Sequence, residues 1–103
     1  YNYKELERDL LANLDNSRKV MQIQVAFMTH YDERVFANID RHQFAIRSKI
    51  LDIMRQTKES ELTKPNFRED LAERIRLETN ALRESDEDFG CTEGVYFSSF
   101  VVQ

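Results

Sequence analysis

Apolar and polar side chains alternate between residues 20 and 30, a pattern that predicts a β-strand with one buried face. The apolar members of this pattern are Met21, Ile23, Val25 and Phe27. A dense run of β-forming residues at 95–102 predicts a second strand near the end of the chain. We expect both strands in one antiparallel sheet, with the four apolar side chains facing a layer of helices.

Two longer stretches show helical periodicity. Across 33–57, one stripe predicts a single helix capped by Asp32, and this stripe thins near Arg41-His42-Gln43. The members of the stripe are Val35, Phe36, Ile39, Gln43, Ile46, Ile50, Ile53 and Met54. Pro65 marks the start of the next helix, because proline is well tolerated at a first helical turn. The apolar residues that follow at near-helical spacing are Phe67, Leu71, Ile75 and Leu82.

Residues 5–14 fit two structures. The pattern slightly favours a helix, whose stripe would contain Leu6, Leu10, Leu11 and Leu14. The alternative is a strand that returns as a hairpin across the polar cluster at 15–18 and uses the alternation of Leu10, Ala12 and Leu14. The predicted fold class is therefore α+β: a small antiparallel sheet with two helices packed on one face, in the order ββααβ or αβααβ.

The composition fits one domain of 103 residues. Hydrophobic residues make up 41% of the chain, too many for disorder, and two glycines and one proline are too few for an all-β fold. The net charge is −4, and acids lie beside each basic cluster, which argues against binding of nucleic acid. The chain has no run of about 18 apolar residues, so we expect no membrane-spanning segment within it.

The residues capable of catalysis or metal binding are few and scattered. His30 and His42 are the only histidines and lack the spacing of metal ligands, and Cys91 is alone. Ser98 and Ser99 lie in the predicted terminal strand, without the G-x-S-x-G turn of a hydrolase. We therefore expect no metal site, no cofactor, no disulfide within the chain and no catalytic activity.

Three surface features each admit two interpretations. Glu69 and Glu73 share a helix face, but nearby arginines favour a solvated surface over a pair of catalytic carboxylates. The strand at 95–102 could offer its edge to a partner, although its apolar composition favours a central strand of the sheet. The stretch 28–31 could form a contact loop, but residues of this kind more often close over one end of a core.

The end of the chain resembles the C-terminal signature of the FliL family, an aromatic-rich strand that ends in Val/Ile-Gln. Here this segment is Val95-Tyr96-Phe97-Ser98-Ser99-Phe100-Val101-Val102-Gln103. The signature positions within it are Val95, Tyr96, Phe97, Phe100, Val102 and Gln103.

Further matches to the same family cover most of the chain. Residues 46–54 resemble the Ile-Arg-Asp-x-Ile-Leu segment of its first helix, and 79–82 resemble the Ile-Asn-x-x-Leu segment of its second. The opening of that second helix resembles 62–71, with Phe67-Arg68 where the family usually has Gly-Lys. The pair Asn13-Leu14 resembles the end of the family's first strand, which favours the strand interpretation of 5–14.

The resemblance implies a location and a function that the pattern alone does not. FliL proteins are single-pass inner-membrane proteins of the flagellar basal body, with a periplasmic domain that resembles the stomatin-like fold and has no known catalysis. This domain is thought to form a ring around the ion-driven stator unit and to support its active state and torque under load. The resemblance thus implies that residues 1–103 are one periplasmic domain, that the N-terminal anchor lies outside them, and that the partners are stator subunits and further copies.

Two other classes of protein remain open at this point. One is a periplasmic adaptor of the same fold that binds a different inner-membrane complex, which co-purification with stator subunits would distinguish. The other is an enzyme whose site is assembled from scattered residues. A deep pocket holding a carboxylate or histidine with a strongly perturbed pKa would favour the enzyme.

Overall fold

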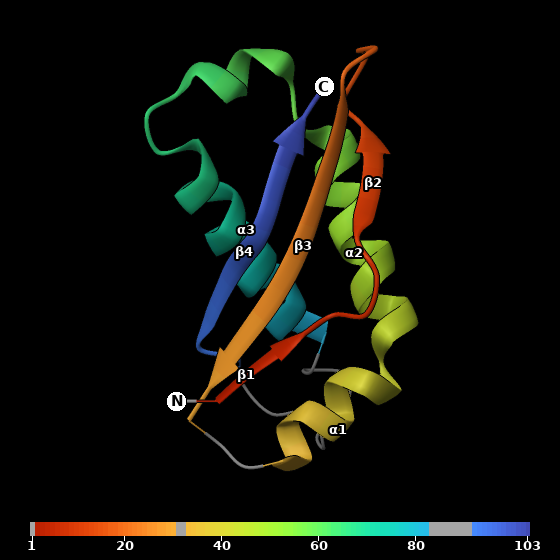
Figure 1. The fold of residues 1–103 in the computed structure, drawn as a ribbon, viewed down its shortest axis with the longest axis vertical. Helices are drawn as coiled ribbons and strands as arrows, with labels where there is room; N and C mark the ends of the chain where they lie inside the picture. The colour runs from red at the N-terminus through yellow and green to blue at the C-terminus, as the bar shows by residue number, and fades with distance from the viewer. Residues whose placement is uncertain (1, 31–32, 83–91) are drawn as a thin grey trace.

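A long central strand, β3 (Val20–Thr29), organises the sheet (Figure 1). The computed structural model describes residues 2–30, 33–82 and 92–103. Strand β4 (Gly94–Val102) pairs antiparallel with β3 along one edge. Strands β1 (Asn2–Glu5) and β2 (Leu10–Asn13) also pair antiparallel with β3, opposite its two halves. Because β4 occupies one edge of β3 along most of its length, β1 and β2 share the other edge.

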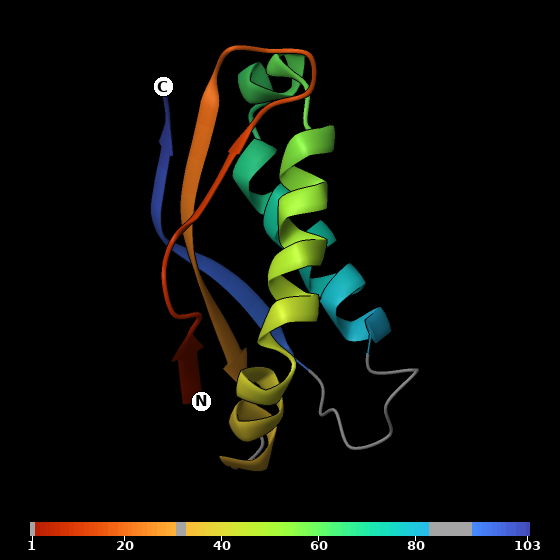
Figure 2. The same ribbon diagram turned by 90° about the vertical axis from the view of Figure 1, so that its right-hand side faces the viewer.

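The two strands predicted from alternation and composition are confirmed. Both belong to one antiparallel sheet, with Met21 opposite Val102 and Phe27 opposite Val95. The four alternating side chains of β3 have no exposed surface and lie in the core cluster with residues of the helices. The α+β class is therefore correct, with the sheet on one side and the helices on the other (Figure 2).

The segment 5–14 contains no helix, and residues 10–13 form β2, so its slight preference for a helix is wrong. Leu10 and Ala12 are buried in β2 while Leu11 is 60% exposed, as the alternation of a strand requires. Strand β1 is an element that the pattern did not predict. Between β1 and β2 the backbone of Arg8 adopts a left-handed conformation, with φ of 66°, which redirects the chain.

The predicted helix over 33–57 is two helices, α1 (Glu33–Arg41) and α2 (Gln43–Gln56). The break lies at His42, with φ of −104° and ψ of 19°, where the apolar stripe thins. The change of direction allows α1 to bury Val35 and Ile39, and an ion pair of 3.1 Å joins Lys4 on β1 to Asp40 on α1. The proposed cap, Asp32, lies outside the described residues.

The helix expected after Pro65 is confirmed as α3 (Phe67–Leu82), and a short 3-10 helix, η1 (Glu59–Thr63), precedes it. Helices α2 and α3 cover the sheet and bury their apolar stripes against it (Figure 2). The fully or nearly fully buried helix residues are Ile46, Ile50, Ile53, Met54, Phe67, Leu71, Ile75 and Thr79. Leu82 is only partly buried. In the described part of the chain, the helical layer thus contains three α-helices rather than two.

Asn80 connects the end of α3 to the segment that leads into β4. Its side-chain amide donates to the carbonyl of Thr92 at 2.9 Å, and its carbonyl accepts from the Thr92 N–H at 3.0 Å. Thr92 is only 1% exposed, so water has little access to replace these bonds. The side chain of Asn80 therefore supplies the pairing that a neighbouring strand would give.

We expect Asn80→Ala to lower the free energy of unfolding by about 1–2 kcal/mol, because two hydrogen bonds to a buried backbone are lost. Urea denaturation followed by circular dichroism measures this change. Asn13→Ala is the control, since the Asn13 side chain is exposed and makes only one long bond of 3.4 Å, to Ser17. An equal loss in both variants would contradict the proposed contribution of Asn80.

Candidate interaction surface

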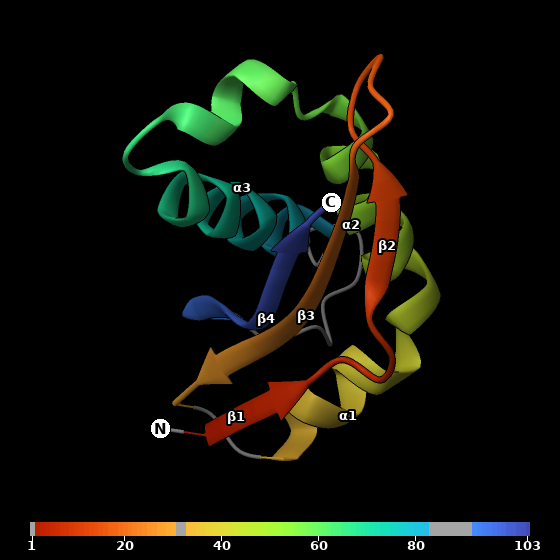
Figure 3. The same cartoon turned by 45° about the horizontal axis from the view of Figure 1, so that its top comes forward.

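Strand β4 is an edge strand. Among the described residues it pairs only with β3, and Figure 3 shows it as the outer strand of the sheet beside α3. The expectation that its apolar composition marks a central strand is therefore wrong. The apolar residues of β4 are explained instead by the packing of one of its faces on the helices.

A β-bulge at Ser98 explains the spacing of the aromatic signature. The pairing with β3 skips Ser98, whereas Phe97 and Ser99 both have partners. An extra residue of this kind shifts the alternation of faces by one position. Phe97 and Phe100, which an unbroken strand would place on opposite faces, therefore both pack against the helical core.

The outer edge of β4 carries backbone groups that do not point toward β3. Gln103 and Val20 exchange two backbone hydrogen bonds, of 2.9 and 2.8 Å. In an antiparallel ladder, pairs of this kind alternate with pairs whose N–H and C=O groups point away from each other. Val102 and Phe100 occupy the alternate positions, so their backbone groups are directed toward the open edge.

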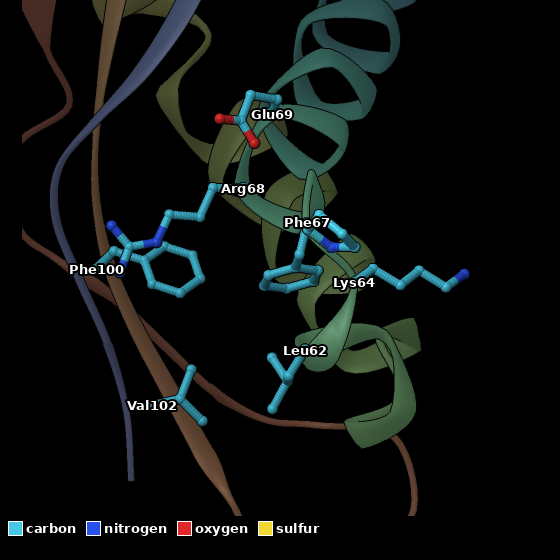
Figure 4. Close-up of a pocket in the computed structure, with 8 residues that line it drawn as sticks. Leu62, Lys64, Phe67, Arg68, Glu69, Phe100 and Val102 are labelled. Atoms are coloured by element: carbon cyan, nitrogen blue, oxygen red, sulfur yellow. The ribbon is translucent and has the colours of Figure 1, made fainter.

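A groove runs along this edge between β4 and α3. One hollow of about 430 Å3 lies beside Phe100 and Val102 and reaches Leu62 and Phe67 on the opposite wall (Figure 4). A second hollow of about 390 Å3 lies beside Glu93 and the first half of β4, residues 94–97. Among the described residues, only Arg68 and Glu69 line both hollows. Because these residues join the two hollows, we call the hollows together the α3–β4 groove.

Arg68 is held at the middle of the α3–β4 groove. Its guanidinium carbon lies 4.6 Å from the centre of the Phe100 ring, a cation–π contact. Phe100 in turn packs against Phe67 and Phe97, with ring centres 5.9 and 5.3 Å away. Within the described part of the chain, no carboxylate forms an ion pair with Arg68 or with Lys64, the other cation of the first hollow.

The second hollow differs because its charges are largely paired within the protein. Arg76 donates two hydrogen bonds to Glu73, of 2.6 and 2.9 Å, and these bonds hold the pKa of Glu73 below its usual value. Glu93 accepts a hydrogen bond of 3.0 Å from the backbone N–H of His30, and a ring nitrogen of His30 lies 3.0 Å from the same carboxylate oxygen. The positive charge available to a ligand is therefore concentrated at the Phe100–Val102 end of the groove.

The outer face of the sheet carries a separate aromatic patch. Tyr96 packs against Tyr3, with ring centres 6.0 Å apart, and its hydroxyl lies 3.9 Å from the sulfur of Met28. A Cβ atom at Gly94 would lie 3.0 Å from the Tyr96 ring, so glycine leaves room for that side chain. Within the stretch 28–31, Met28 thus contributes to this surface and Thr29 is buried, while residue 31 lies outside the described residues.

The signature residues serve different surfaces. Val95 is buried, and Phe97, Phe100 and Val102 are partly buried against the core. Tyr96 points to the outer face and is 50% exposed. Gln103 is exposed, and its backbone closes the ladder with β3.

The other residues considered from the sequence do not come together in one place. His30 lies at the end of β3 and His42 at the junction of α1 and α2, while Cys91 lies outside the described residues. Within the described ranges, no group of three or more His, Cys, Asp or Glu side chains is placed to hold a metal ion. Ser98 is the bulge residue, and Ser99 pairs with β3. The expected absence of catalysis and bound metal stays a prediction.

The described helices contain none that is both long and apolar enough to cross a membrane. What the α3–β4 groove offers chemically is a backbone edge, an apolar floor and a positioned cation. These are properties of a surface that binds another polypeptide.

Comparison with known proteins identifies the family. The model of the family described as flagellar basal body-associated protein FliL matches residues 3–103, so the chain belongs to the FliL family. A search of curated proteins finds no match. Membership of this family implies an accessory role at the flagellar basal body.

Proposed function

We propose that this domain is a non-enzymatic structural scaffold of the bacterial flagellar motor. Its membership of the FliL family supports a role at the basal body. The observation that supports scaffolding most directly is the open edge of β4, which carries the family signature and borders the α3–β4 groove. A scaffold needs a surface that binds other polypeptides, and this edge provides one.

In this proposal the domain lies in the periplasm as part of a single-pass inner-membrane protein. Several copies form a ring around the ion-driven stator unit and support its active state and its torque under load. The fold accords with a mechanical role, because the central strand β3 pairs on both edges and is covered by helices on one face.

Co-purification from membranes tests the proposed partner. The full-length protein, carrying an affinity tag, is expected to recover the stator subunits from detergent-solubilised membranes. The untagged protein, processed in parallel, controls for non-specific recovery. Recovery of a different inner-membrane complex without stator subunits would instead support an adaptor of the same fold.

We expect the soluble domain to be monomeric or weakly associated in dilute solution, although it forms a ring in the proposal. A membrane anchor confines and orients subunits, and tethering of this kind raises apparent affinity by about 10²–10⁴-fold without new contacts. Each interface in a ring is heterologous, because isologous contacts close as dimers. A ring built on tethering therefore needs only weak individual interfaces.

Analytical ultracentrifugation at about 10 μM measures this association, since that concentration would populate a complex of micromolar affinity. The expected result is the sedimentation coefficient of a monomer. A stable closed ring at this concentration would show that the domain assembles without the membrane, and the tethering argument would then be wrong.

A further inference from the structure

We propose that the α3–β4 groove binds an extended acidic segment of a partner protein, which adds to β4 as an antiparallel strand. The segment carries an apolar residue two positions before a carboxylate residue. This inference rests on the proposed scaffold function and deepens it by naming the chemistry of the segment that docks.

The backbone of β4 provides the first part of the recognition. Phe100 and Val102 direct their N–H and C=O groups toward the open edge, as the hydrogen-bonded pair of Val20 with Gln103 requires. A peptide that adds to such an edge gains main-chain hydrogen bonds, and pockets for alternate side chains give specificity. The α3–β4 groove supplies pockets of this kind along the same edge.

The side chains of the groove define two adjacent positions of the peptide. On an added strand, residues two apart lie on the same face, beside Val102 and beside Phe100. The residue beside Val102 would enter the apolar space that Leu62 and Phe67 border (Figure 4). The residue beside Phe100 would meet the guanidinium of Arg68, which is already stacked on that ring.

The charge of the groove favours a carboxylate at the second position. Lys64 and Arg68 both line the first hollow, where Glu69 is the single acid. Figure 4 shows Glu69 at the opposite end of this hollow from Leu62 and Val102. A carboxylate beside Phe100 would accept charge-assisted hydrogen bonds from Arg68, which the stacking contact has already oriented.

The direction of the peptide follows from the order of the two positions. Strand β4 runs from Phe100 to Val102, so an antiparallel peptide passes Val102 first. Its apolar residue therefore precedes its acidic residue in the sequence. Antiparallel pairing is chosen because it extends the pattern of every other pair in this sheet.

A second copy of the chain is a poorer occupant of the same edge. Two β4 strands could pair with each other, but β4 contains no acidic residue between Gly94 and Val102. Such a dimer would bring nothing from β4 to pair with Arg68. The charge of the groove is therefore better matched by a different, acidic segment.

Titration of the purified chain with synthetic peptides tests the proposal. The probe is a fluorescently labelled, β-prone peptide of about eight residues with Ile-Thr-Glu at its centre, a typical strand length. The matched peptides carry Ile-Thr-Lys or Ile-Thr-Gln instead. We expect the glutamate peptide to bind at least about tenfold more tightly than the lysine peptide, the size of one charge-assisted hydrogen bond.

Three variants locate the interaction. Arg68→Glu should reverse the preference, so that the lysine peptide binds more tightly than the glutamate peptide. Val102→Pro should abolish binding of both, because proline removes an N–H that points to the open edge and donates no bond to β3. Arg55→Glu is the control, because Arg55 is exposed on α2 and lines neither hollow. Circular dichroism verifies that each variant is folded. If Val102→Pro does not fold, the reversal of peptide preference in Arg68→Glu tests the proposal by itself.

The proposal is overturned if the three peptides bind equally or not at all, or if NMR shifts on binding lie outside β4 and the start of α3. It is also overturned if the chain forms dimers that Val102→Pro abolishes, because the occupant would then be a second copy. Failure of the peptides to bind would leave recovery of stator subunits unaffected. Peptide binding without recovery of stator subunits would instead reject the flagellar partner and keep the groove.

Discussion

Ile50→Ala is expected to lower the free energy of unfolding by about 2–5 kcal/mol, the range for a large-to-small change in a core. Ile50 lies in the middle of α2 and has no exposed surface. The substitution removes apolar contacts and leaves a cavity between α2 and its neighbours, which close packing prevents from collapsing fully. In a domain of this size such a loss is a large part of the total stability.

Denaturation in urea, monitored by circular dichroism, measures the effect through the shift of the midpoint at an unchanged slope. Ser48→Ala on the same helix is the control, because Ser48 is exposed and its replacement should change stability by less than about 0.5 kcal/mol. A change of that small size at Ile50 would show that the apolar stripe of α2 does not face the core in solution.

The elements that the sequence predicted best are those whose burial is decided by their own periodicity. The alternation of β3 required one buried face, and its four apolar side chains form the centre of the core. The stripe of α2 likewise predicted which residues are buried, Ile46, Ile50 and Ile53 among them. In both elements the local pattern and the final packing depend on the same residues.

The elements that the sequence misjudged depend on partners far away in the chain. Residues 5–14 had helical as well as strand spacing, and the pairing of β2 with β3 decided between the two. The composition of β4 suggested a central strand, yet the bulge at Ser98 turns both Phe97 and Phe100 toward the helices. An edge strand can therefore be as apolar as a central one. Only the pairing reveals its position.

The α3–β4 groove was not predicted for a similar reason. Periodicity assigns Arg68 to the solvated face of its helix, because its neighbour Phe67 takes the buried position. The contact with Phe100 joins residues that are remote in sequence. One signal was present in the sequence, because Phe67-Arg68 departs from the Gly-Lys that the resemblance to the FliL family leads one to expect. Both residues line the first hollow of the α3–β4 groove.

Arg47 on α2 connects the helical layer to the loop between β1 and β2. Its guanidinium donates three hydrogen bonds to backbone carbonyls, at 2.7 Å to Glu7, 2.9 Å to Arg8 and 2.9 Å to Asp9. This loop contains Arg8, whose backbone is left-handed, and the loop is not part of the strand pairing on either side of it. Among the described residues, these three carbonyls accept their hydrogen bonds from Arg47, and the planar fork of a guanidinium suits their arrangement.

Arg47→Ala is expected to lower the free energy of unfolding by about 2–3 kcal/mol, since hydrogen bonds to a charged donor are lost and water replaces only part of them. Arg47→Lys should give an intermediate loss, because an ammonium group cannot reproduce the fork. Arg55→Ala is the matched control on the same helix, where the ion pair with Asp52 is exposed and 3.7 Å long.

Urea denaturation of the three variants gives the ranking, and hydrogen exchange of the β1 and β2 amides shows where the loss occurs. Faster exchange in β1 and β2 of Arg47→Ala, with β3 and β4 less affected, is expected because the lost bonds hold only the first two strands. If Arg47→Ala and Arg55→Ala lost equal stability, the three carbonyl bonds would contribute nothing. The pairing with β3 alone would then hold β1 and β2 in place.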